Sequence, residues 1–80
     1  MYHVTLYTKP GCHLCEAAQA LLARLAAELP LTVTAVNIAE DEGLLARYGE
    51  RIPVVRVGET ELAAPLSEFR LRRALTRGMV

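Results

Sequence analysis

The pair Cys12 and Cys15, separated by two residues, constrains this chain more than any other feature. An alternating apolar pattern over residues 2–7 predicts a strand before the pair, and the Lys-Pro-Gly sequence at residues 9–11 predicts a turn. From residue 14 onward, apolar residues recur with a helical period, at positions 14, 18, 21, 22, 25 and 29. We therefore expect Cys12 at or beside the first turn of a helix, with Cys15 on the same helix face.

Charge and spacing at such a position favour redox chemistry. The amino-terminal end of a helix is positive, so it favours a thiolate at Cys12 over a thiol. Cysteines three positions apart on a helix can fall within the Cα separation that a disulfide tolerates. A C-x-x-C motif between a strand and a helix therefore indicates a redox-active pair.

Two other uses of the cysteines have less support. A structural disulfide closing so short a loop would restrict the unfolded chain very little. A structural zinc site needs two more ligands, and beyond the two cysteines the chain offers His3 and His13. We expect His13 to point around the helix from the thiols, so we assign no metal ligands.

Length and charge limit the class of protein. Eighty residues, 52% of them hydrophobic, predict one domain over residues 1–80 with an ample core. Nine basic and nine acidic residues cancel, which gives no general attraction to nucleic acid or membrane. The strand pattern begins at residue 2, without a signal-peptide pattern, and no apolar run reaches membrane-spanning length. We expect a cytoplasmic monomer, in a compartment where cysteines stay reduced unless they serve catalysis, sensing or metal binding.

The first half of the chain predicts a β-α-β-α order. The helix that begins near Cys12 runs to about residue 28, and Pro30 marks its end. Alternating β-branched residues predict a strand over residues 31–37. Acidic residues 40–42 suit the start of a short helix that carries Leu44, Leu45 and Tyr48 inward and stops at Gly49.

The second half of the chain predicts a hairpin and a last helix. Residues 51–57 form a strand pattern opened by Pro53, and a two-residue turn at 58–59 leads into a strand over 60–63. A helix follows over about residues 66–77, with Ser67 or the Ala64-Pro65 step at its start. The order β-α-β-α-β-β-α predicts an α/β fold with a central four-stranded mixed sheet and helices on its faces.

Together these features resemble the thioredoxin superfamily and, within it, the short bacterial glutaredoxin-like proteins. The resemblance covers nearly the whole chain and implies a thioredoxin-like fold. It is carried by the element order and by three motifs: Lys9-x-x-Cys12-x-x-Cys15, Tyr48-Gly49 and Ile52-Pro53.

The resemblance also implies roles for individual residues. Cys12 is the attacking thiolate and Cys15 the resolving thiol. Pro53 is expected to be cis, against a background of about 5–6% for X-Pro bonds. Ile52 offers its backbone to the substrate, as an added strand does. Lys9 matches a lysine that glutaredoxins direct toward a carboxylate of glutathione.

Three departures from the glutaredoxin pattern bear on glutathione. The usual Gly-Gly step after the fourth strand is replaced by Ala63-Ala64, and Ser67 or Glu68 stands at the position of an acidic residue. His13 stands within the motif, where a protonated imidazole would stabilise the thiolate, although an exposed histidine without a role is the alternative. No cofactor is required, and we expect glutathione to serve as an inefficient electron donor.

The predicted function is therefore that of a glutaredoxin-like thiol–disulfide oxidoreductase in cell redox homeostasis and electron transport. Its partners are a disulfide-containing protein or small molecule, and glutathione or a thioredoxin-type reductase as donor. An iron–sulfur or other metal-thiolate module, or a redox-sensing interaction domain with little turnover, are the alternatives. A copper chaperone fits poorly, because such proteins place methionine where this chain has Pro10 and follow a different element order.

Overall fold

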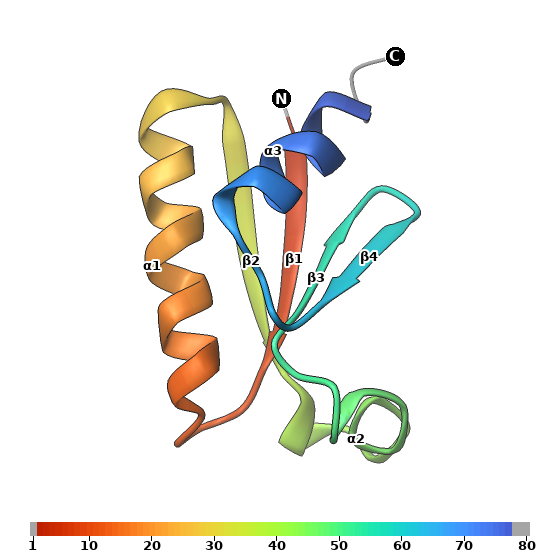
Figure 1. The fold of residues 1–80 in the computed structure, drawn as a ribbon. Coiled ribbons are helices and arrows are strands. Elements are labelled where there is room, and N and C mark those ends of the chain that lie inside the picture. Colours follow the sequence, from red (N-terminus) through yellow and green to blue (C-terminus); the bar gives the residue numbers. More distant parts are fainter. Residues whose placement is uncertain (1, 78–80) are drawn as a thin grey trace.

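The computed structural model describes residues 2–77, and its four strands form one mixed sheet in the order β2-β1-β3-β4 (Figure 1). The strands are β1 (Tyr2–Thr8), β2 (Leu31–Asn37), β3 (Val54–Val57) and β4 (Thr60–Ala63). β1 runs parallel to β2 and antiparallel to β3, and β3 and β4 form an antiparallel hairpin. The predicted α/β architecture is confirmed.

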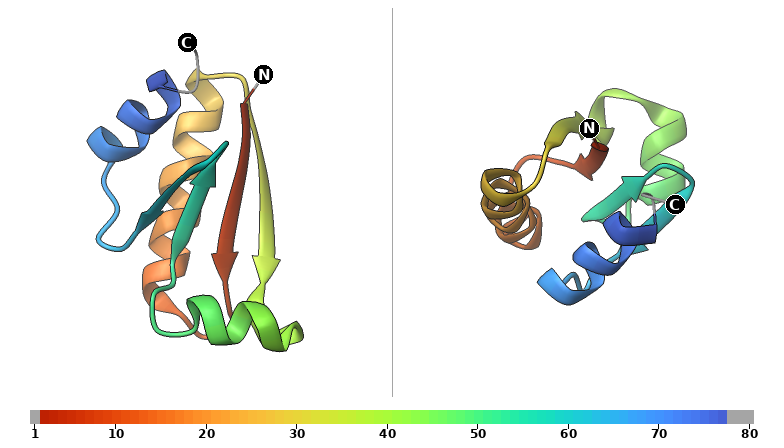
Figure 2. Two further views of the ribbon diagram at one scale, coloured as in Figure 1. Left: turned by 90° about the vertical axis from the view of Figure 1, so that its right-hand side faces the viewer. Right: turned by 90° about the horizontal axis from the view of Figure 1, so that it is seen from above.

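Three helices and one turn of 3-10 helix connect and flank the strands. They are α1 (His13–Glu28), the 3-10 turn η1 (Ile38–Glu40), α2 (Glu42–Tyr48) and α3 (Glu68–Arg77). Figures 1 and 2 show α1 and α3 on one face of the sheet, with α2 across its lower end on the other side. The order of helices and strands is as predicted, apart from η1, which the sequence did not indicate.

The main core lies between the sheet and the layer formed by α1 and α3. Val4 and Leu6 are two positions apart on β1, so they point to the same face, and both are 0% exposed. They share one buried cluster with Leu22 of α1 and Leu71 of α3. Because each fully buried side chain of this size contributes about 1.5–3 kcal/mol, this cluster is a main stabiliser of the fold.

A second core on the opposite face fixes α2 to the end of the sheet. The Tyr7 and Tyr48 rings stack with centroids 4.3 Å apart, and the Tyr48 hydroxyl donates a hydrogen bond to the Glu61 carboxylate at 2.5 Å. The hydrogen bond to Glu61, followed by burial of the ring, raises the pKa of Tyr48 above its usual value. The contacts of Tyr48 join α2 to both β1 and β4.

Two leucines lie outside the core, contrary to the sequence pattern. Leu45 of α2 is 43% exposed, because this helix spans only the end of the sheet and buries one narrow side. The expectation that Leu45 points inward is therefore wrong. Leu14, the first apolar position of the α1 pattern, is 64% exposed.

Two exposed ion pairs connect α1 to α3, and two X-Pro bonds are cis. Arg24 of α1 pairs with Glu68 at 2.9 Å, and Arg72 pairs with Glu28; both pairs are exposed and contribute little individually. The Ile52-Pro53 bond is cis, as predicted, and the Ala64-Pro65 bond is cis as well.

Candidate active site

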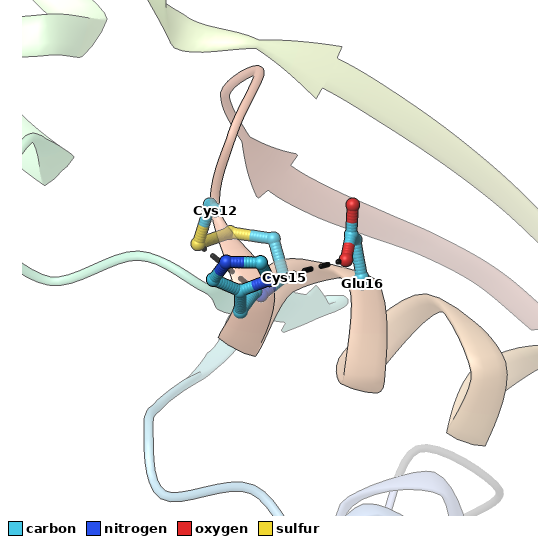
Figure 3. Close-up of a disulfide and its surroundings, with 4 residues drawn as sticks. Cys12, Cys15 and Glu16 are labelled. Atoms are coloured by element: carbon cyan, nitrogen blue, oxygen red, sulfur yellow. Dashed lines mark hydrogen bonds and ion pairs between the residues drawn. A yellow bond between two sulfur atoms is a disulfide. The ribbon is translucent and has the colours of Figure 1, made fainter.

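The disulfide Cys12–Cys15 lies where the turn after β1 enters α1, as Figure 3 shows. The two Cα atoms are 5.2 Å apart, within the usual disulfide range. Cys12 is the residue that caps α1, and the helix begins at His13. The turn that delivers Cys12 contains Gly11 with a φ of 79°, a conformation that glycine adopts without steric cost.

The two sulfur atoms have different surroundings. Cys12 is half-buried, whereas Cys15 is only 2% exposed and lies on the inner side of α1. The backbone N–H of Cys15 donates a hydrogen bond to the Cys12 sulfur at 3.2 Å. Cys12 thus occupies the position at which serine or aspartate commonly caps a helix, and its sulfur receives a donor that favours negative charge.

A polar cleft of about 270 Å³ exposes the disulfide to solvent on one side. The cleft is formed by the turn after β1, the first turns of α1 and the end of β2. Both cysteines line it together with five polar side chains, those of Thr8, Lys9, Glu16, Gln19 and Asn37. Lys9 contributes the one cationic side chain among the residues lining the cleft.

An apolar groove of about 490 Å³ runs along α1 from the cysteine motif. One wall is a stripe of α1, and the other is the segment between β4 and α3, with Pro53 at the base of β3. All the side chains that line the groove are apolar: Leu14, Ala17, Ala18, Leu21, Pro53, Ala64, Pro65 and Leu66.

Four of the predicted site residues line one or the other of these two hollows. Lys9 joins Cys12 and Cys15 in the polar cleft, while Pro53 lines the apolar groove. Ile52, directly before Pro53, is half-buried and donates its backbone N–H to the Tyr48 carbonyl at 3.1 Å.

His13 and Ser67 lie in other settings. The His13 side chain is 95% exposed and lies 3.6 Å from the carboxylate of Glu16. Ser67 caps α3, since its hydroxyl oxygen accepts a hydrogen bond from the Arg70 N–H at 3.1 Å. Ser67 therefore has a local structural role whatever it contributes to a substrate.

The sequence reasoning did not anticipate the apolar groove. The sequence pattern makes Leu14 the first apolar position of the helix after Cys12 and puts Ala63-Ala64 where glutaredoxins have a glycine step, and neither feature indicates a groove. The available signal was the run Ala63-Ala64-Pro65-Leu66, which carries no polar side chain in a segment facing the motif helix.

The described part of the chain has neither a membrane-spanning helix nor a cluster of metal-binding side chains. No helix within residues 2–77 is long and apolar enough to cross a membrane. No group of three or more histidine, cysteine, aspartate or glutamate side chains within the same range is placed to hold a metal ion.

The fold and the cysteine pair define the class of protein. A four-stranded mixed sheet, helices on both sides, and a C-x-x-C pair at the start of the first helix make a thioredoxin-like fold. A thioredoxin from Halobacterium salinarum superposes on 99% of this chain and 75% of its own, with a TM-score of 0.75, and its 18% identity supports the shared fold alone.

The sequence comparison specifies the family. Residues 3–76 match the family described as glutaredoxin-like domain (DUF836), and the chain belongs to that family. An uncharacterised protein of Mycobacterium tuberculosis is 31% identical, in a match that covers 92% of this chain and 82% of that protein.

Two solved structures are similar to nearly the whole chain. The protein XcR50 from X. campestris is 37% identical, with a TM-score of 0.81 over 92% of this chain and 96% of its own. The protein Ne2328 from Nitrosomonas europaea is 28% identical, with a TM-score of 0.78 over 90% of this chain and 88% of its own. The similarity thus extends over about nine-tenths of this chain.

Proposed function

We propose that this protein is a thiol–disulfide oxidoreductase in which Cys12 attacks a disulfide and Cys15 resolves the intermediate. The observation that carries the proposal is the unequal accessibility of the two sulfurs at the start of α1. Cys12 caps the helix and is half-buried, whereas Cys15 is 2% exposed. A disulfide that approaches from solvent therefore meets Cys12 first.

The reaction starts from the reduced pair and balances as two exchange steps. The Cys12 thiolate attacks one sulfur of the substrate disulfide, so a mixed disulfide forms and the other substrate sulfur leaves as a thiolate. The Cys15 thiol gives up its proton to solvent and its sulfur attacks the Cys12 sulfur, which breaks the mixed disulfide; the departing substrate thiolate takes up a proton from solvent. That step closes the Cys12–Cys15 disulfide and releases the second substrate thiol, so two electrons pass from the protein to the substrate.

Three features favour a reactive thiolate at Cys12. An unperturbed thiol is only about 3% ionised at pH 7, so stabilisation of the anion raises the reactive fraction. The N-terminal end of α1 and the N–H of Cys15 both stabilise negative charge on this sulfur. Lys9 supplies a positive charge in the same cleft. His13 has less influence, because its side chain is almost fully exposed.

The proposal includes the following partners. The substrate is a disulfide in a protein or small molecule, and glutathione or a thioredoxin-type reductase returns the pair to its reduced state. The chemistry needs no bound cofactor, because the cysteine pair itself stores the two electrons. A pair that must be reduced again after each turnover suits the cytoplasm, where thiols are kept reduced.

A single-turnover assay tests this function directly. The protein is reduced, freed of reductant and mixed with an aromatic mixed disulfide that releases a coloured thiolate. We expect one equivalent of rapid release from the wild type and none above background from Cys12→Ser. Equal release from both proteins would refute the assignment of Cys12.

The electron donor is identified by a second assay. Steady-state turnover is compared with glutathione plus glutathione reductase and with thioredoxin reductase. Faster turnover with one donor assigns the protein to that branch of the superfamily. A protein that completes one turnover but shows no sustained turnover with either donor would have a redox-sensing role.

A further inference from the structure

We propose that two copies of this chain pair through the outer edge of β2, so that their two sheets become continuous. β2 stands at one end of the strand order and pairs with β1 alone among the strands within residues 2–77. Figure 2 shows it as the outermost strand of the sheet. On an edge strand, alternate residues direct their N–H and C=O groups outward, where a further strand can bind them.

The two edges of the sheet differ in length and charge. β4, at the opposite edge, has four residues and includes the charged residue Glu61. A short edge strand that carries a charge is protected against pairing with another chain. β2 has seven residues, extends about 23 Å, and contains neither a charged residue nor a proline. β2 therefore lacks the protection that β4 has.

The side of α1 next to β2 extends this uncharged surface. A groove of about 300 Å³ lies between the helix and the strand, and none of the residues that line it is charged. Ala23 and Ala26 of α1 and Ala35 of β2 are exposed in it. Helices that pack together have axes 8–10 Å apart, and small side chains permit this approach. The exposed alanines therefore leave room for α1 of a second copy on the same face of the joined sheet.

The sequence of β2 favours a second copy of this chain as the occupant. Two β2 strands that run antiparallel about a two-fold axis at Thr34 bring all seven residues of each strand into register. On the side of α1, Val33 of each copy then faces Ala35 of the other, and on the opposite side Thr34 faces Thr34. Apolar pairs and threonine pairs are favourable neighbours across two strands.

The charge of the surface also favours self-association. Residues near the axis of a two-fold dimer meet their own copies, so a charge there would face the same charge. Neither β2 nor the groove beside it carries a charge, and the formal net charge of the whole chain is zero. Two copies therefore approach without repulsion. A strongly charged partner would find no complementary charge on this surface.

The size of the surface implies a weak and reversible dimer. A stable interface buries about 1,600 Å² in total, and transient ones bury less than about 1,200 Å². Here each copy contributes one strand and one side of one helix. We expect a dissociation constant on the order of 10⁻⁴ M. At low concentration the protein is then the monomer that the sequence leads us to expect.

Sedimentation velocity of the protein over a range of concentrations measures this association. A non-thiol reductant keeps Cys12 from cross-linking two copies. The wild type should be mostly monomeric at about 10 µM and mostly dimeric at about 1 mM, concentrations that lie on either side of the expected dissociation constant.

Thr34→Lys tests the position of the interface. It places two like charges at the axis and should weaken the dimer at least about tenfold. Thr34 is exposed, so its replacement leaves the core intact, which circular dichroism verifies. Thr60→Lys is the matched control, because it adds the same charge to β4 at the other edge. This control should form dimers as the wild type does.

Two variants with opposite charges test the symmetry of the pairing. Thr34→Glu alone should weaken the dimer as Thr34→Lys does. An equimolar mixture of the two variants should form dimers at a concentration where each alone is mostly monomeric, because lysine and glutamate then face each other across the axis. This recovery is expected only if Thr34 of one copy lies opposite Thr34 of the other.

Three results would overturn the proposal. They are a wild type that stays monomeric at about 1 mM, a dimer that Thr34→Lys leaves unchanged, and a mixture of the two charged variants that does not recover the dimer. None of them affects the proposed function, because β2 pairing does not involve the cysteines. At about 1 µM, where the protein is monomeric, Thr34→Lys should match the wild type in single turnover.

Discussion

The backbone N–H of Cys15 points at the sulfur of Cys12 from 3.2 Å, so the nucleophile of the proposed reaction is also the cap of α1. Structure and chemistry therefore depend on the same atom. An anionic sulfur is a stronger acceptor than a neutral one, which links ionisation of Cys12 to the stability of the first helical turn.

The capping role predicts different effects for two replacements of Cys12. Serine keeps an acceptor at this position and alanine does not, so Cys12→Ala should be less stable than Cys12→Ser by about 0.5–2 kcal/mol. Urea unfolding of both variants measures the difference, and neither can form the disulfide, which removes that variable. Equal stabilities would show that the contact with the Cys15 N–H contributes nothing.

Replacing two leucines of α1 should change the stability of the protein by very different amounts. Leu22 is 1% exposed, so Leu22→Ala should lower the free energy of unfolding by about 2–5 kcal/mol. Leu14 is 64% exposed, and Leu14→Ala should change it by less than about 0.5 kcal/mol. Urea unfolding under reducing conditions tests both. A large loss for Leu14→Ala would mean that this side chain is buried in solution.

Tyr48 predicts a loss of stability in alkaline solution. Its pKa is raised in the folded protein by the hydrogen bond to Glu61 and by burial, so the folded state holds this proton more tightly than the unfolded chain. The contribution is complete below the unfolded pKa of about 10 and is lost as the pH rises through the folded pKa. Tyr48→Phe removes this contribution.

The measurement is urea unfolding of wild type and Tyr48→Phe between neutral and alkaline pH. At pH 7 the variant should be less stable by about 1.5 kcal/mol, the low end for a hydrogen bond to a charged group. The difference in the free energy of unfolding between the wild type and the variant should narrow above pH 10. A constant difference at all pH values would contradict the assigned cause of the pKa shift.

The apolar lining beside the motif predicts weak use of glutathione. Losing one or two charge-assisted hydrogen bonds weakens binding at least about tenfold. Titration of the Cys15→Ser protein with glutathione should therefore give small NMR shifts, near Lys9 and Ile52, that approach saturation only at high concentration. Saturation at low concentration would show that the alanines replacing the glycine step do not impair binding.

Much of this fold follows from local periodicity in the sequence. The β-branched pattern of residues 31–37 and the helical repeat after Cys12 predicted β2 and α1 to within about one residue. The helix buries one regular face, with Cys15, Ala18, Leu22 and Leu25, whereas no residue of β2 is fully buried. The pattern failed at Leu45, because α2 lies across the end of the sheet and has little to pack against. The turn η1 depends on the Asn37 side chain, which accepts a hydrogen bond from the Ala39 N–H at 2.9 Å.

Part of the candidate site was predictable because its residues lie close together in the sequence. The motif itself places Cys12 and Cys15, and the turn before it brings Lys9 to the same cleft. The apolar groove joins residues about 50 positions apart, at Leu14 and Leu66, so no local pattern reveals it. Its lining depends on how the segment after β4 packs against α1.

The central claim is the division of labour between Cys12 and Cys15, and trapping of the intermediate tests it most directly. Reduced Cys15→Ser is exposed to a small mixed disulfide and analysed by mass spectrometry of its peptides, with Cys12→Ser and the wild type in parallel. We predict a lasting adduct on Cys12 in Cys15→Ser, an internal disulfide without adduct in the wild type, and little modification of Cys12→Ser. If an adduct forms on Cys15 of the Cys12→Ser protein as fast as it forms on Cys12 of the Cys15→Ser protein, the account is contradicted.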